Sequence, residues 1–248
     1  MIAQSYDKVP ENDSILLDLP FREGSGTGTF DHAKPHHPMA MNDPGGGSFV
    51  WTTLASGIMV LEFTTIGGGG TDGVYLDSPA AETADLDFTT GDFSLGCWIK
   101  WDSTGGWSEI IMGRYGVDLD GWEVYLDISG GRNTVSQRHH HVSLTPNENS
   151  NCYSIGWAPG AWCLLGISRK GSSLYPKHYR NGVELGVTYE ASGMLAPDTC
   201  NRDLTIGCRY TKDANYFSNM RGRIIISGKA LSASEWLSMY KHQARWYA

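Results

Sequence analysis

Apolar and polar residues alternate in short runs along most of this chain. Such runs occur at residues 15–21, 58–63, 73–76, 93–101, 109–112, 122–128, 138–144, 162–169, 174–180, 204–206 and 223–227. Alternation over four to nine residues, bounded by turn residues, is typical of strands with one buried face. The pattern therefore predicts an all-β chain built from antiparallel strands.

Two stretches interrupt this pattern. Asn181-Gly182 separates two of the runs and predicts a tight hairpin, because a type I′ turn needs positive φ at both central residues. Residues 31–57 are rich in His, Pro, Met and Gly, show no clean period, and are expected to form a loop-rich insertion. Since no linker or repeat divides the runs, residues 1–248 are expected to form a single domain.

The chain closes with a helix signal. Ser232 and Glu235 form a capping box, so a helix is expected to begin there and to continue through residues 232–248. Trp236, Tyr240 and Tyr247 fall near one face of this helix. We expect this aromatic face either to pack on the edge of the folded β-strands or to dock on a partner protein.

Three segments carry a family resemblance. Residues 92–101, 178–185 and 220–236 resemble the laminin-G-like jelly roll of the concanavalin A-like lectin/glucanase superfamily, over roughly residues 14–240. The resemblance implies an antiparallel jelly-roll β-sandwich with a short C-terminal helix. Its members serve as carbohydrate or protein recognition modules, as polysaccharide-degrading enzymes, and in viral particles.

Charge and hydropathy exclude some classes of partner. The net charge of −8 and the scattered basic residues argue against nucleic-acid binding. No apolar run approaches the length of a membrane span, and the first residues lack the features of a Sec-type signal peptide. Of the five cysteines, Cys97 and Cys208 lie in apolar strand patterns and are expected in the core, while Cys152 and Cys163 are expected to be reduced rather than paired.

Catalytic carboxylates are not apparent. Retaining glucanases of this superfamily place carboxylates at alternate positions of one strand, whereas here Glu123 and Asp127 share a face without a carboxylate between them. We therefore expect that this protein is not an enzyme, and we assign no catalytic residues. The histidines at 32, 36, 37 and 139–141 are expected in wet loops or strand ends; alternation leaves at most His139 and His141 for one metal.

Calcium is the one cofactor that the resemblance suggests. Asp72, Asp118 and Asp120 are candidate ligands, because calcium prefers oxygen donors in loops. Many relatives carry an Asp-Asp pair on the final strand, where this chain has Arg223-Ile224-Ile225, and this departure weakens the calcium prediction.

Aromatic residues in predicted loops are candidates for stacking on sugar rings. Trp107, Tyr115, Tyr153 and Trp157 lie beside Gly, Ser or Asn and are predicted to bind a glycan; the alternative is that they anchor their loops.

The sequence thus predicts a non-catalytic recognition or structural module, with a phage decoration or tail-fibre protein as the specific hypothesis. A cell-surface glycan and a homo-oligomer or larger assembly are its expected partners, on a virion or an extracellular surface. Residues 31–57 and the C-terminus are expected at subunit contacts. The rival hypothesis is a glycan-cleaving hydrolase or lyase of the same superfamily.

Overall fold

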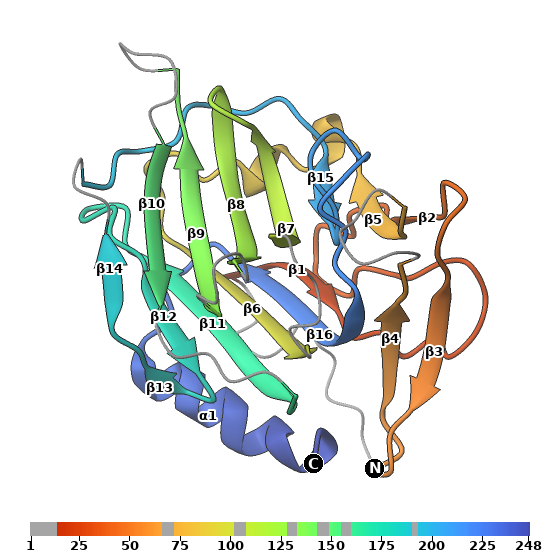
Figure 1. Cartoon of the computed structure of the whole chain (residues 1–248). Helices are drawn as coiled ribbons and strands as arrows, with labels where there is room; N and C mark the ends of the chain where they lie inside the picture. Colours follow the sequence, from red (N-terminus) through yellow and green to blue (C-terminus); the bar gives the residue numbers. More distant parts are fainter. Residues whose placement is uncertain are drawn as a thin grey trace.

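The computed structural model describes residues 14–65, 72–101, 108–127, 133–142, 149–154, 160–189 and 193–248. These residues form two antiparallel sheets that pack face to face, with one helix on the outside (Figure 1). The predicted antiparallel β-sandwich with a short C-terminal helix is confirmed.

Sheet A has the strand order β13-β12-β11-β6-β16-β4-β3, and β1 also pairs with β16. Its strands are β1 (Ile15–Leu19), β3 (Phe49–Thr53), β4 (Met59–Phe63), β6 (Phe93–Lys100), β11 (Cys163–Arg169), β12 (Lys177–Arg180), β13 (Val183–Glu184) and β16 (Asn219–Ser227). The turn from β12 to β13 has positive φ at Asn181 (54°) and Gly182 (78°), as the hairpin prediction requires.

Sheet B has the order β14-β10-β9-β8-β7-β15-β5-β2. Its strands are β2 (Ala40–Asn42), β5 (Tyr75–Ser78), β7 (Glu109–Gly116), β8 (Asp120–Asp127), β9 (Thr134–His140), β10 (Asn149–Ser154), β14 (Val187–Tyr189) and β15 (Leu204–Ile206). The 3-10 helices Ala80–Glu82 and Ala84–Leu86 connect β5 to β6.

The main core lies between the two sheets. On β8 the side chains of Trp122, Val124 and Leu126 enter this core, and on β16 those of Ile224 and Ile226 do so. Because neighbouring strand residues point to opposite faces, the residues between them lie on the outer faces of the sandwich. Those outer faces carry the candidate sites.

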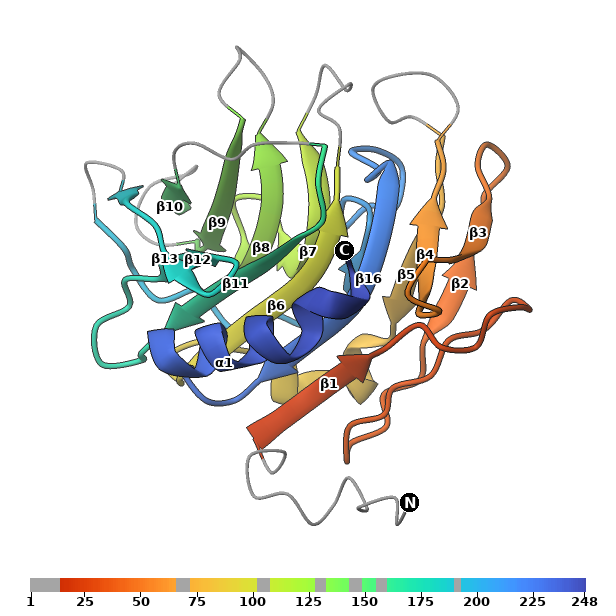
Figure 2. The same ribbon diagram turned by 90° about the horizontal axis from the view of Figure 1, so that it is seen from below.

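A second core cluster fixes the helix to sheet A. The helix α1 (Ala233–Gln243) begins with the predicted capping box of Ser232 and Glu235, and its Trp236 is fully buried. Trp236 lies over Gly96 and Gly166, which are register partners on β6 and β11. Glycine at both positions leaves the space that the indole fills, and α1 runs along this outer face (Figure 2).

The C-terminal residues also pack on the sandwich. The helix ends earlier than predicted and is followed by the 3-10 helix Ala244–Trp246. The Tyr247 ring stacks on Trp98 of β6 with 4.2 Å between ring centroids, and Tyr247 is buried. Of the two alternatives for the aromatic face, packing on the sandwich is therefore the observed one.

The prediction of a loop-rich insertion at residues 31–57 is wrong in part. The segment contains β2 and β3, which extend sheets B and A at their edges. Its apolar side chains Met39, Met41, Phe49 and Trp51 pack against the main core. Burial of these side chains supplies a free-energy gain that a solvated loop would lack.

The five cysteines, Cys97, Cys152, Cys163, Cys200 and Cys208, are free and buried. Burial raises the pKa of Cys97, Cys163 and Cys200 to about 12. These three thiols therefore stay protonated. That all five cysteines are free agrees with the expectation that Cys152 and Cys163 are reduced. Among the helices that the structure describes, none has the length and apolar character that a membrane crossing needs.

Candidate functional site

The outer face of sheet B carries polar side chains in a patterned array. Glu123, Tyr125 and Asp127 of β8 point away from the core, because their neighbours on the strand point into it. The register pairs Arg138 of β9 with Glu123, and Asn151 of β10 with Arg138. Three adjacent strands thus bring these side chains together.

Glu123 lies at the centre of this array. It is 3% exposed, its Oε1 lies 3.0 Å from His140 Nε2, and it accepts a hydrogen bond of 3.2 Å from Arg138 Nη1. The Tyr115 hydroxyl also hydrogen-bonds this carboxylate, and burial keeps the pKa of Tyr115 well above its ordinary value.

The charge of Glu123 follows from these contacts. Burial alone would raise the pKa of the carboxyl, but the hydrogen bonds and positive charge of its partners outweigh burial and lower the pKa. Glu123 is therefore ionised at neutral pH. It serves to orient its neighbours and is not available as a proton donor.

Tyr125 and Arg138 form the adjoining part of the array. Arg138 Nη2 donates to the Tyr125 hydroxyl at 2.6 Å, and Asn151 Nδ2 donates to the same oxygen at 3.3 Å. The Arg138 guanidinium also lies 4.8 Å from the Tyr125 ring centroid. The Arg138 side chain is 26% exposed, so it can contact a ligand that approaches from solvent.

A pocket of about 220 Å³ opens beside these residues. Its polar lining includes Glu123, Tyr125, Asp127, Arg138, Arg209 and Asn215. Asn215 fixes one wall, because its Nδ2 donates to the Ser108 carbonyl at 2.7 Å and its own carbonyl accepts from Ile110 N at 3.0 Å. The pocket is small, polar and held by strands, which suits recognition of hydroxyl-bearing ligands.

The aromatic residues predicted to bind a glycan lie in different environments. Tyr115 is not an exposed loop residue: it lies on β7, is 1% exposed, and stacks on His140 with 4.9 Å between centroids. The rings of His140 and Tyr210 pack against the ring that was expected to stack on sugars. Tyr153 is half-buried on β10, whereas Trp107 and Trp157 lie outside the described residues.

Tyr153 lies on the outer face with the polar array. Its register partner on β9 is Ser136, and the register partner of Ser136 on β8 is Tyr125. Two strand spacings separate Tyr153 from Tyr125, which is about 9.6 Å. The predicted residue Tyr153 therefore lies on the same face as the pocket, two strands away from Tyr125, which lines it.

The predicted calcium ligands do not form a cluster. Asp118 and Asp120 lie at the β7–β8 turn, where Asp118 has a φ of 57° and the Asp120 carboxylate accepts from Arg202 Nε at 3.1 Å. Asp72 lies elsewhere, with its Cβ against Gly46. Within the described ranges, no group of three or more His, Cys, Asp or Glu side chains could hold a metal ion. Calcium at these residues stays a prediction.

The prediction that the histidine triplet lies in a solvated loop or strand end is wrong. His139, His140 and His141 are all buried, and they alternate between faces as strand geometry requires. His139 Nδ1 lies 2.8 Å from the Leu195 carbonyl on the core side, while His140 supports Glu123 on the outer face. Pairing of β8 with β9, which the sequence does not reveal, is what identifies His140 and Arg138 as site residues.

Solved structures share this architecture. A structure of botulinum neurotoxin type C, described by its interaction with two ganglioside molecules, matches 93% of this chain and 51% of its own length at 14% identity and a TM-score of 0.62. The receptor binding domain of botulinum neurotoxin D matches 94% of this chain and 53% of its own length, at 13% identity and a TM-score of 0.64.

A third match is the binding domain of botulinum neurotoxin DC in complex with rat synaptotagmin II. It shares 13% identity over 93% of this chain and 52% of its own length, with a TM-score of 0.59. The chain thus spans about half the length of these structures, and the likeness at this identity concerns the fold. No curated protein matches the chain in sequence.

A family model supplies the assignment that the sequence resemblance predicted. The laminin G model of the concanavalin A-like lectin/glucanases superfamily matches residues 68–235, from the segment before β5 to the first turn of α1. This range includes the whole polar array of sheet B. The chain belongs to the concanavalin A-like lectin/glucanases superfamily.

Proposed function

We propose that this domain is a non-catalytic recognition module that binds a glycan on the outer face of sheet B. The observation that carries the proposal is the row formed by Tyr153, Ser136 and Tyr125 beside the polar pocket. A half-exposed aromatic ring can pack on the apolar face of a sugar, while Arg138 and Asn215 supply hydrogen-bond donors at fixed positions. The binding domains among the structural neighbours support this class of function.

The geometry of the carboxylates supports recognition over hydrolysis. Glu123 and Asp127 are four residues apart on β8, which separates them by about 13 Å. Glycosidases place their two carboxyl groups about 5–5.5 Å apart when they retain configuration and about 6.5–9.5 Å apart when they invert it. Because Glu123 is ionised, it cannot itself be the proton donor that either mechanism needs.

A glycan lyase is the second candidate, and one contact favours it. Tyr125 and Arg138 meet at 2.6 Å beside the pocket, and a tyrosine with a neighbouring cation is suited to proton transfer next to a carboxylate. Burial nevertheless raises the pKa of Tyr125 above its ordinary value, although Arg138 acts in the opposite direction. A protonated hydroxyl of this kind cannot serve as the general base.

A glycan array followed by titration tests the main proposal. Tyr153→Ala should weaken binding of the best glycan by about 0.5–1.5 kcal/mol, the range for one aromatic contact. Trp107→Ala belongs in the same series, because the sequence predicts that Trp107 stacks on a sugar. Phe30→Ala is the matched control, since Phe30 is 67% exposed and lies outside the pocket lining. No bound glycan at millimolar concentration would refute the proposal.

The same glycans distinguish binding from cleavage. We expect neither reducing ends nor the ultraviolet absorbance of an unsaturated sugar after prolonged incubation. Release of either product, abolished by Tyr125→Phe or Arg138→Gln, would replace recognition with catalysis.

The finer part of the proposal is that the module serves a virion, as a phage decoration or tail-fibre protein that meets a cell-surface glycan as a homo-oligomer. Tyr247 and the apolar side chains of residues 31–57 named above pack on their own sandwich, so a contact with a second subunit would use other side chains of these segments, such as the exposed Val50 and Trp246. Light scattering of the purified chain and its recovery with phage particles test this part. A chain that stays monomeric and never accompanies a particle would refute it.

A further inference from the structure

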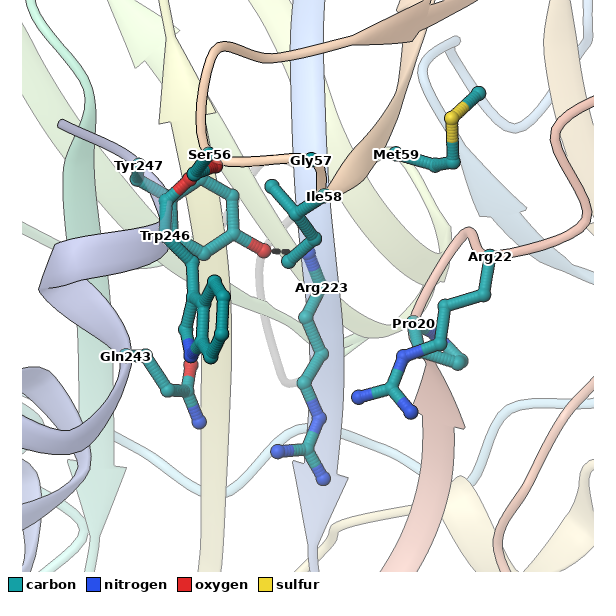
Figure 3. A pocket seen from close by; sticks show the side chains of 10 residues that line it. All are labelled: Pro20, Arg22, Ser56, Gly57, Ile58, Met59, Arg223, Gln243, Trp246 and Tyr247. Atoms are coloured by element: carbon teal, nitrogen blue, oxygen red, sulfur yellow. Dashed lines mark hydrogen bonds between the residues drawn. The ribbon is translucent and has the colours of Figure 1, made fainter.

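A second and larger pocket lies on the opposite side of the sandwich. It has a volume of about 470 Å³ and opens between the end of β1, the β3–β4 turn, β16 and the C-terminal residues (Figure 3). This size falls within the range of about 300–1,000 Å³ that is usual for small-ligand sites. The pocket shares no residue with the one on sheet B, so the inference below does not rest on the proposed function.

One wall of this pocket is rigid. Tyr247 stacks on Trp98, and its hydroxyl oxygen accepts from Arg223 N at 3.0 Å. Trp98 Nε1 donates to Gln243 Oε1 at 2.6 Å. Because the oxygen of the Gln243 amide is engaged with the protein, its nitrogen is the part that can donate to a ligand.

The pocket carries positive charge. Arg223 is held by Asp18 through two hydrogen bonds, of 2.6 and 2.9 Å, so these two charges compensate each other. Arg22 is exposed, and among the described residues no carboxylate lies within ion-pair distance of it. Its guanidinium points toward the Arg223 side of the pocket (Figure 3). A positive pocket on a chain of net charge −8 favours an anionic ligand at this place.

An aromatic ring borders the same space. Trp246 is 41% exposed, lines the pocket, and has the Arg245 guanidinium 4.8 Å from its ring centroid. Ser56 Oγ donates to the Trp246 carbonyl and fixes the backbone there. The indole thus presents a planar apolar surface in the pocket that Arg22 also lines.

We propose that this pocket binds a sugar residue that carries a carboxylate, such as a uronic acid. Arg22 pairs with the carboxylate, because a guanidinium matches its two oxygens. Trp246 packs on the apolar face of the ring, and the Gln243 amide donates to a hydroxyl group. This ligand class carries the two features that the pocket can recognise: a negative charge, which pairs with Arg22, and a ring, which packs on Trp246.

Titration with D-glucuronic acid tests the proposal, with tryptophan fluorescence or protein NMR as the readout. D-glucose has the same ring without the carboxylate, and acetate has the carboxylate without the ring. We expect millimolar binding of glucuronate, and binding of glucose and of acetate weaker by about tenfold or more. Arg22→Gln and Trp246→Ala should each weaken glucuronate binding by about tenfold.

Two controls make the test specific. Lys170→Gln removes one positive charge from an exposed position outside the pocket and should leave the affinity unchanged. Arg138→Gln alters the sheet B pocket and shows whether glucuronate binds there instead. Equal affinity for glucuronate and glucose, equal affinity for glucuronate and acetate, or loss of binding in Arg138→Gln but not in Arg22→Gln would overturn the proposal.

Discussion

The contact of Trp236 with Gly166 predicts how strongly α1 is held to sheet A. A Cβ atom added at Gly166 would lie 2.8 Å from Cδ2 of Trp236 and 2.9 Å from two further ring atoms. Real Cβ atoms do not approach ring carbons so closely, so the Gly166→Ala variant has to displace the indole. The displacement also strains the hydrogen bond of 2.8 Å from Trp236 Nε1 to Ser168 Oγ.

The expected loss of folding stability follows from these contacts. Insertion of a methyl group into a packed core costs about 1–3 kcal/mol, and for a domain of this size each kcal/mol lowers Tm by about 2–4 °C. Trp236→Ala should cost about 3–5 kcal/mol, because it leaves a cavity where the indole was buried. In a chain that already lacks the indole, the added methyl group has space, so its cost should disappear.

Urea and thermal unfolding of the two single variants and the double variant measure this coupling. Gly186→Ala is the matched control, because its added Cβ would meet nothing within 4 Å. We expect the control to stay within about 0.5 kcal/mol of the parent. A Gly166→Ala variant as stable as the parent, or one that loses the same stability with and without Trp236, would refute the packing argument.

Three further predictions concern titratable groups. Burial alone would lower the pKa of His37, but its hydrogen bonds to Asp31 (2.8 Å) and Asp85 (2.9 Å) raise it overall. The stability that His37 contributes should be complete below its unfolded pKa and lost as pH rises through the folded value, so the Tm difference between the parent and His37→Gln should shrink from mildly acidic to alkaline pH. Glu123→Gln should cost about 1–3 kcal/mol at neutral pH, because buried partners lose their ionised acceptor, and the cost should fall in acid as the parent's carboxylate, whose pKa is lowered, becomes protonated. The five buried thiols should react with a thiol reagent only as the chain unfolds, so rapid labelling of the native protein would contradict their burial.

Strands with strong alternation were predictable from the sequence. β6, β8 and β11 place large apolar residues on the core face, and the predicted runs match them within two residues at each end. The capping box located the start of α1, because the Ser232 and Glu235 side chains each accept a hydrogen bond from the other residue's backbone N–H group, a contact that depends on local sequence alone.

Other strands gave no such signal. β10 has the sequence Asn-Ser-Asn-Cys-Tyr-Ser, in which Cys152 is the small apolar residue of the core face. β3 contains Phe49 and Trp51, but the Pro and Gly residues before it obscured the period. Tertiary pairing, rather than local pattern, makes strands of these segments.

The candidate sites depended even more on pairing. Glu123 and Asp127 were identified as a shared face, yet Arg138 and His140 become their neighbours only through the register of β8 with β9. Arg22 and Trp246 are far apart in sequence and line one pocket only because of how the chain folds. A single sequence carries no information on such long-range proximity.

The position of β16 sets the order in which this chain can fold. β16 lies in the middle of sheet A and pairs with β1, β4 and β6, yet it ends at Ser227, near the end of the chain. Until that strand leaves the ribosome, β4 and β6 have no partner on one edge, and β1 has no partner in the sheet. Sheet A therefore closes only after residues 219–227 have been synthesised, which exposes unpaired edges to other nascent chains and makes slow folding the expected behaviour.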